Sequence, residues 1–185
     1  MPETKYAIGD MKVVALSIAG PFAYWMASGH TIKRWGAKSI ELRPWTRNNF
    51  QNVMVLLHIS SNTSFDCFFD QMDFSPEKAP KFSIVGAAIL SEIRKYEDAE
   101  LFERDRRSHC WLGDETHEQV VEQYGIQPYG HVMARPVLFD KPILDVPGDR
   151  GYWVPNPKKE KQFDRQKKAF NKAMKLLEKQ YQLAA

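Results

Sequence analysis

Four polar side chains within six residues form the group in this sequence that is best suited to chemistry. Lys38, Ser39, Glu41 and Arg43 supply an ammonium, a hydroxyl, a carboxylate and a guanidinium. A desolvated lysine beside another cation can act as a base or activate a nucleophile, and it can also anchor a phosphate. Glu41 and Arg43 can recognise a base edge together, or they can form an ion pair that only fixes the wall of the fold.

The alternation of polar and apolar residues predicts a strand over Lys38–Arg43 with one buried face. Strict alternation places Lys38 on the face opposite to Glu41, so the two can meet only where the start of the strand is irregular. Gly36 precedes the strand, and its flexible backbone suits the transition from a helix to a strand. Pro44 lacks an N–H donor and ends the regular hydrogen bonding of the strand.

Other side chains can line the same site from neighbouring elements. His58 and Ser60 end a predicted strand, and Ser17 and Tyr24 can face them from a second wall. Trp45 follows the polar group at once and is the best candidate for stacking on a nucleobase. Each of these residues can equally be structural, with its polar atoms satisfied inside the protein.

The end of the chain is basic, although the net charge of the whole sequence is only +3. From Lys158 onward there are nine Lys or Arg residues and three Asp or Glu residues. An apolar stripe through Phe163, Phe170, Met174 and Leu177 predicts an amphipathic helix over 157–185. That helix can dock on the body with a solvated basic face, pair with another copy, or contact a nucleic-acid backbone. The cations for backbone contact are Lys158, Lys159, Lys161, Arg165 and Lys168.

The composition indicates a soluble globular protein of the cytoplasm. The 185 residues are 43% hydrophobic and 26% charged, no stretch reaches the roughly 20 apolar residues of a membrane helix, and the first residues show no signal pattern. The two cysteines, Cys67 and Cys110, indicate reduced thiols. Without a zinc, phosphate-loop or dinucleotide motif, we predict no metal and no cofactor.

Five to seven short strands interleaved with helices are predicted, which favours a small mixed α+β barrel covered by helices. Residues 1–10 are expected to be a flexible lead-in, and 22–35 a helix that ends at Gly36. Thr116 begins a helix with a capping box, and Pro136 marks an edge or a bulge. The predicted strands are 12–18, 38–43, 53–58, 82–90 and 131–139, with closing strands in 141–153.

The pattern Gly-x-Lys-x-x-Glu-x-Arg, present in full at Gly36, Lys38, Glu41 and Arg43, resembles the signature of the ASCH family, a branch of the PUA-like fold. Further segments resemble those of the family in the same order, and the likeness covers roughly residues 11–156. Typical members reach the signature sooner, so 30–35 looks like an insertion of about two helical turns. The further segments are 15–23, 56–61, 84–88 and 141–153.

The resemblance implies a PUA-like mixed β pseudo-barrel of about five to seven strands. Covering helices and an added C-terminal helix complete it, and a groove lies between the barrel and the first helix. The resemblance implies that the chain divides into a flexible lead-in (1–10), an ASCH/PUA-like domain (11–156) and a basic amphipathic C-terminal helix (157–185). The implied ligand is RNA or a modified nucleobase, held in a groove around Lys38, Glu41 and Arg43.

Some ASCH proteins are amidohydrolases that remove the acetyl group of N4-acetylcytidine, and others are described as ribonucleases. Carried over to this chain, that activity makes Lys38, with Ser39 and Glu41, the catalytic group. The small amidohydrolases carry Thr where this chain has Glu41, and they are much shorter. Three functions therefore stay open: a module that binds RNA or a nucleobase, a hydrolase, and an adaptor that acts through the terminal helix. The sequence leaves the oligomeric state undetermined.

Overall fold

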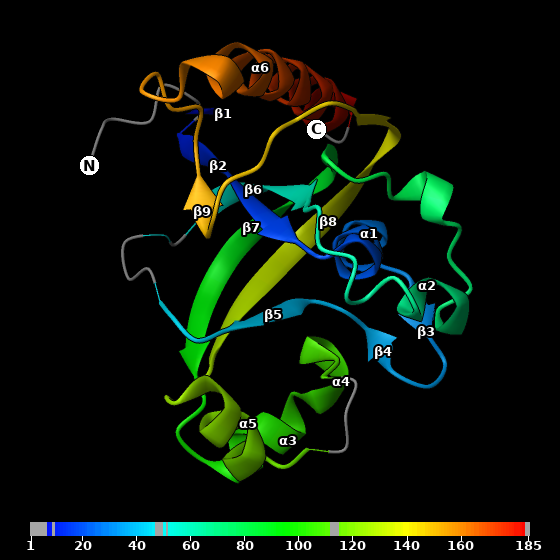
Figure 1. Cartoon of the computed structure of the whole chain (residues 1–185), viewed down its shortest axis with the longest axis vertical. Helices are drawn as coiled ribbons and strands as arrows, with labels where there is room; N and C mark the ends of the chain where they lie inside the picture. Colours follow the sequence, from blue (N-terminus) through cyan, green and yellow to red (C-terminus); the bar gives the residue numbers. More distant parts are fainter. Residues whose placement is uncertain (1–6, 9, 47–49, 51, 112–114, 184–185) are drawn as a thin grey trace.

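Runs rich in Val, Ile and Leu form the central strands of one curled sheet (Figure 1). The computed structural model describes residues 7–8, 10–46, 50, 52–111 and 115–183. The strands of this sheet are β1 (Ala7–Ile8), β2 (Met11–Ile18), β5 (Ile40–Arg43), β6 (Val53–Ile59), β7 (Ser83–Lys95), β8 (Tyr129–Ile143) and β9 (Tyr152–Trp153).

The strands follow the order β1-β2-β6-β7-β8-β5, and β9 pairs with β2. β2 and β6 run parallel, whereas the other pairs are antiparallel. In this order β5 is an edge strand that pairs with β8 and not with β2. The sheet is therefore open between β5 and β2, and this opening is called the seam of the half-barrel.

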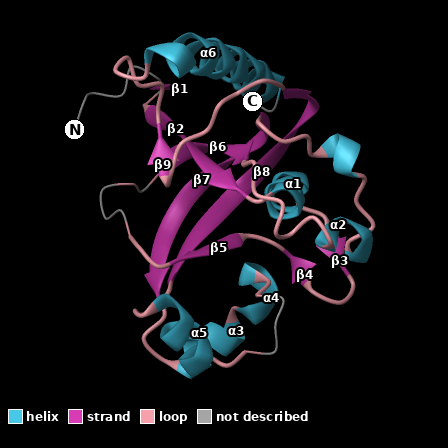
Figure 2. Ribbon diagram, in the orientation of Figure 1, coloured by secondary structure: helices cyan, strands magenta, loops and turns pink. Residues whose placement is uncertain are grey.

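Helices cover both faces of the sheet and its lower end (Figure 2). α1 packs on β6, β7 and β8, whereas α6 packs on β1, β7 and β8. The helices are α1 (Gly20–Ser28), α2 (Phe68–Gln71), the 3-10 turn η1 (Pro76–Lys78), α3 (Ala99–Arg104), α4 (Arg106–His109), α5 (His117–Tyr124) and α6 (Glu160–Leu183). This α+β half-barrel with covering helices and a C-terminal helix confirms the predicted fold class.

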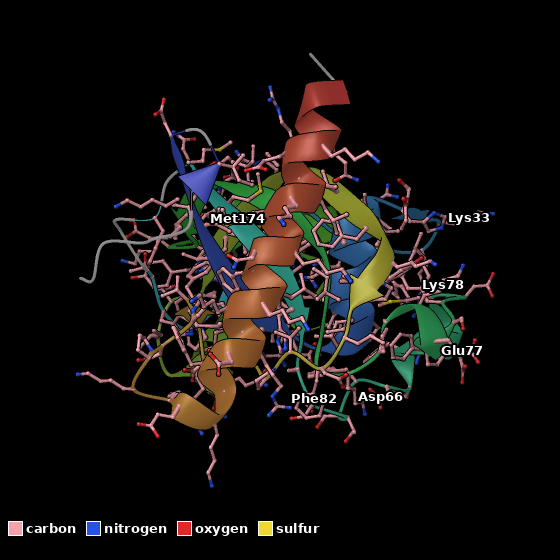
Figure 3. All side chains as sticks on the ribbon, turned by 90° about the horizontal axis from the view of Figure 1, so that it is seen from above. Lys33, Asp66, Glu77, Lys78, Phe82 and Met174 are labelled. Carbon is pink, nitrogen blue, oxygen red and sulfur yellow. The ribbon has the colours of Figure 1, made fainter. Side chains whose placement is uncertain are left out.

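Both faces of the sheet are buried because two cores lie on opposite sides of it. Val14 and Leu16 of β2 pack in the cluster that contains Met26 of α1. Ala15, between them in sequence, packs in the cluster that contains Phe170 of α6. Figure 3 looks down on α6 and shows it crossing over the strands. The C-terminal helix is therefore part of the core.

The prediction of one helix over 22–35 was wrong. α1 ends at Ser28, because Gly29 adopts a left-handed conformation with φ 61°. The segment that follows forms a hairpin of β3 (Thr31–Ile32) and β4 (Gly36–Ala37), fixed at its start by the Trp25 indole, which donates to the His30 carbonyl at 2.7 Å. The expected insertion is thus a hairpin instead of two helical turns.

Other local predictions were confirmed or need adjustment. Thr116 caps α5 in a full capping box, and the β7–β8 register shifts next to Pro136. Part of the expected lead-in, Ala7–Ile8, is ordered as β1, because the edge of β2 offers backbone partners; residues 1–6 and 9 lie outside the described residues. No helix in the described part of the chain is long and apolar enough to cross a bilayer.

Candidate functional site

β5 presents the polar group on one face and buries its other face. Ile40 and Leu42 pack with Tyr96 and Phe102 beneath the α3–α5 helices. Glu41 lies opposite His131 of β8 in the antiparallel register, so these two side chains share the other face. The start of the strand is irregular, because the Ser39 amide donates to the Ser108 carbonyl at 2.9 Å.

This irregular start brings Lys38 to the same place as Glu41. The Lys38 ammonium lies 3.1 Å from Glu41 Oε2 and donates to the carbonyls of Ile40 (3.0 Å) and His109 (2.9 Å). These three acceptors match its three N–H groups. Lys38 is only 6% exposed, and its Nζ lies 5.5 Å from the centroid of the Phe22 ring.

Glu41 is held between two cations. Its Oε1 lies 3.0 Å from Arg43 Nη2, while Oε2 faces Lys38. Burial acts to raise the pKa of Glu41, but the Lys38 and Arg43 charges outweigh it and hold that pKa below its usual range. The carboxylate is therefore ionised at neutral pH, and the three charged side chains of the motif form one cluster.

Arg43 also bridges the seam of the half-barrel. Its Nη2 donates to the Ser17 carbonyl of β2 at 2.9 Å, so one guanidinium links β5 to β2. Its Nε is buried and has no hydrogen-bond partner among the described residues. The Arg43 side chain is 25% exposed, compared with 5% for the Lys38 side chain. Arg43 is thus the most exposed member of the cluster.

Ser17 connects the cluster to His58. The Ser17 hydroxyl accepts from the Trp153 indole at 3.1 Å and lies 3.0 Å from His58 Nδ1 and 2.9 Å from the Asp149 carbonyl, and its single proton can serve only one of these two acceptors at a time. His58 Nε2 lies 2.8 Å from the Val146 carbonyl, which can only accept. Burial lowers the pKa of His58 to about 4, so this ring is neutral at pH 7.

Trp45 lies beside the cluster but is packed by other rings. Its carbonyl accepts from His131 Nε2 at 3.0 Å, and its ring meets His131 and Tyr152 edge-on, with centroids at 4.9 and 5.6 Å. The Tyr152 hydroxyl lies 2.9 Å from His131 Nδ1. These contacts fix the position of Trp45 and cover part of the ring that was predicted to stack.

Two predicted site residues make their contacts with residues outside the cluster. Tyr24 packs edge-on against Phe74, with ring centroids 5.1 Å apart. The Ser60 hydroxyl accepts from the Asn62 amide at 3.3 Å in the turn after β6. Ser39 is half-buried next to the cluster, and the structure gives its hydroxyl no contact with Lys38 among the described residues. The structure thus gathers Lys38, Glu41 and Arg43, and among the described residues Ser17 links this cluster to His58.

Sequence reasoning missed the partners that come from distant parts of the chain. His131 faces Glu41 only because of the β5–β8 register, and His109 meets Lys38 through a backbone carbonyl. Phe22, placed on the first helix, gave no sign in the sequence that its ring would face the ammonium. His131 could have been predicted only from the pairing register of β5 and β8, which the sequence does not give.

The basic residues of the tail lie on the exposed side of α6 and in the segment just before it. Lys158, Lys161, Arg165 and Lys168 are exposed, whereas Lys159 pairs with Asp149. A shallow, open depression of about 430 Å³ lies between exposed side chains of α6. Its lining among the described residues is Asp164, Lys167, Lys168, Asn171, Lys172 and Lys175.

Comparison with known proteins gives a match in structure alone. No protein family and no curated protein matches the sequence. The crystal structure of ASCH from Zymomonas mobilis is similar over 80% of this chain and 92% of that chain, with a TM-score of 0.51 and 16% identity. A serine-to-alanine variant of the same protein matches over 82% of this chain and 94% of its own, with a TM-score of 0.50 and 16% identity. At this identity the likeness concerns the fold, and the chain has the fold of the ASCH domain, as its motif predicted.

Proposed function

We propose that this protein binds RNA or a modified nucleobase at the Lys38–Glu41–Arg43 cluster, with Arg43 as the direct contact. The observation that carries the proposal is the state of the Arg43 guanidinium. It is partly exposed, it is held in place through Nη2, and its Nε has no partner. Nε itself is buried, so a ligand would first meet the exposed part of the Arg43 side chain. A ligand acceptor that also satisfied Nε would remove the cost of an unpaired donor.

The chemistry of a guanidinium fits this ligand class. Its planar fork donates to two acceptors at once, which matches the edge of a base or a phosphate. Glu41 and the Ser17 carbonyl hold the group in one orientation before a ligand arrives, and this lowers the entropy lost on binding. His131 and Tyr152 fix Trp45 nearby in the same way.

Lys38 supports binding better than it supports hydrolysis. A lysine that acts as a base or activates a nucleophile must present its nitrogen to the substrate. Here the ammonium is buried and already has three acceptors. The hydrolase with Lys38, Ser39 and Glu41 as catalytic group therefore stays a prediction, and so does the adaptor role of the terminal helix.

The basic side of α6 supplies a second, less specific contribution. Lys161, Arg165 and Lys168 of α6 and Lys158 just before it are exposed, and they can lie along a phosphate backbone. Such contacts raise affinity for any nucleic acid and weaken as salt increases. In this proposal Arg43 selects the ligand and α6 adds affinity for longer chains.

The test compares Arg43→Gln with Arg94→Gln, using a panel of unmodified and acetylated nucleosides and RNAs of about ten nucleotides. Arg94 is a matched control, since its side chain is 24% exposed and pairs with two carboxylates, Glu92 and Asp105. We expect at least one compound to raise the melting temperature of the wild type. Arg43→Gln should weaken that binding by about fivefold or more, while Arg94→Gln should not. If no compound binds the wild type at low salt, the proposal is wrong.

A further inference from the structure

Four aromatic rings form a partly exposed surface beside the Lys38 cluster, here named the aromatic shelf. They are Phe22 of α1, Trp35 of the β3–β4 hairpin, Phe65 in the turn before α2, and Phe68 at the start of α2. The Phe22 centroid lies 5.3 Å from that of Phe65 and 5.8 Å from that of Phe68. Phe65 and Phe68 stack at 6.3 Å, and Trp35 meets Phe68 at 6.4 Å. Three segments far apart in sequence thus supply one continuous surface.

The shelf adjoins the charged cluster through Phe22. The Phe22 ring lies under the Lys38 ammonium at 5.5 Å and contacts Phe65. Phe65 is 38% exposed, whereas Phe22, Trp35 and Phe68 are half-buried. An exposed large aromatic residue on a folded domain is informative when it continues a cluster instead of standing alone.

Cations lie along the side of the shelf that the hairpin forms. Lys33 and Arg34 are exposed on the hairpin turn, and the Arg34 guanidinium lies 5.4 Å from the Trp35 ring centroid. On the α2 side Asp66 is neutralised by Lys81 at 2.7 Å, while Asp70 is an exposed acid. The positive hairpin next to stacked rings is the arrangement that single-stranded nucleic acids favour, with phosphates on cations and bases on aromatic faces.

We propose that the aromatic shelf is a stacking platform for the bases of single-stranded RNA whose neighbouring nucleotide occupies the Arg43 site. This inference rests on the proposed function and adds to it a second set of contacts and a role for the hairpin at 30–35. Base stacking needs accessible ring surface, which Phe65 retains and which Trp45 partly loses to His131 and Tyr152. The platform therefore lies on α1, α2 and the hairpin, and not at Trp45.

The experiment measures binding of the full chain to fluorescent single-stranded RNA of about ten nucleotides, and to the nucleoside that binds best, for Phe65→Leu and Phe82→Leu. Leu keeps an apolar side chain but has no π face. Phe82 is the control for the loss of an exposed ring that does not belong to the shelf. It is 48% exposed and makes no ring contact with the shelf among the described residues, although its neighbour Lys81 pairs with Asp66 beside Phe65. Phe65→Leu should weaken RNA binding by about fivefold or more and leave nucleoside binding unchanged. Phe82→Leu should match the wild type in both assays.

Several results would overturn the platform, and they are distinguishable. Unchanged RNA affinity in Phe65→Leu overturns the platform but leaves the Arg43 site intact. The same holds if the wild type binds nucleosides and gains nothing from a longer RNA. If sedimentation shows that the wild type self-associates and Phe65→Leu does not, the shelf belongs to a second copy of the chain and the RNA assignment is wrong. A wild type that binds neither RNA nor nucleosides refutes the proposed function and the platform together.

Discussion

Lys38 is a buried charge whose structural role can be measured without any ligand. Its ammonium pairs with the Glu41 carboxylate and donates hydrogen bonds to two backbone carbonyls, those of Ile40 in β5 and His109 in α4. Removing one partner of a buried ion pair leaves the other charge and its hydrogen-bond partners unsatisfied. The same lysine therefore combines two roles, holding the Glu41–Arg43 pair in place and closing the start of β5.

We predict that Lys38→Met lowers the free energy of unfolding by about 3 kcal/mol, measured by urea denaturation. The exposed pair of Lys95 and Glu97 offers a control, and Lys95→Met should leave the unfolding midpoint unchanged. The double variant Lys38→Met/Glu41→Leu should recover part of the loss, because it removes both buried charges. A loss in Lys38→Met no larger than in Lys95→Met would show that the ammonium does not stabilise the fold.

At the scale of elements, Gly86 sets how closely β7 approaches β8. A Cβ atom at this position would lie 2.2 Å from the Val137 carbonyl oxygen and 2.9 Å from the Ala27 side chain of α1. The backbone on one side and α1 on the other leave no room for it. This tight contact allows the sheet to curl at the register shift between Ile84 and Gly86.

We predict that Gly86→Ala destabilises the protein by about 3 kcal/mol, because β8 or α1 must move to admit a methyl group. Gly125→Ala is the comparison. Its methyl group would enter open space, so only the strain of its φ of +70° remains, about 1 kcal/mol. Thermal and urea unfolding of both variants measure the difference. Equal losses at the two positions would contradict the role of close approach at Gly86.

The elements that the sequence predicted are those with local signals. The capping box at Thr116 and the register shift near Pro136 depend on neighbouring residues, and both are present. The hairpin after α1 was missed because Ile32 and Trp35 are three residues apart, as on a helix, while Gly29 had already ended the helix. The helical spacing of apolar residues therefore did not predict where α1 ends.

The candidate site was predictable only where its residues are close in sequence. The spacing of Lys38, Glu41 and Arg43 indicated a common cluster, and the irregular strand start allows it. The bond from Arg43 to the Ser17 carbonyl could not be predicted, because it crosses a seam between strands that do not pair. The aromatic shelf was missed for the same reason, since its rings meet only after α1, α2 and the hairpin have packed.

At the scale of the whole molecule, the basic side of α6 and the motif strand β5 lie at opposite ends of the sheet (Figure 1). The shallow depression on α6 is lined by four lysines, one Asp and one Asn. A nucleoside at Arg43 cannot touch both regions, whereas a long RNA can follow the surface between them. Affinity for short and long ligands should therefore depend on different residues.

We predict that Lys168→Glu, Lys172→Glu and Lys175→Glu combined weaken binding of long RNA and leave nucleoside binding unchanged. The slope of log affinity against log salt should fall by about 0.7 for each lost phosphate contact. Reversal of Lys78, Arg104 and Arg135, which are exposed elsewhere, changes the net charge equally and serves as the control. If both triple variants alter RNA binding alike, the effect comes from total charge and α6 is not a specific contact surface.

The burial of α6 also bears on how the protein is made. Phe170, Ala173 and Leu177 complete a core whose other members include Val13 and Ala15, near the beginning of the chain. During translation these early strands leave the ribosome long before their covering helix has been synthesised. One apolar face of the nascent sheet stays open to solvent or to chaperones until residues near 177 emerge. Biosynthesis should therefore pass through a late docking step, visible as protease sensitivity in nascent chains stalled before α6.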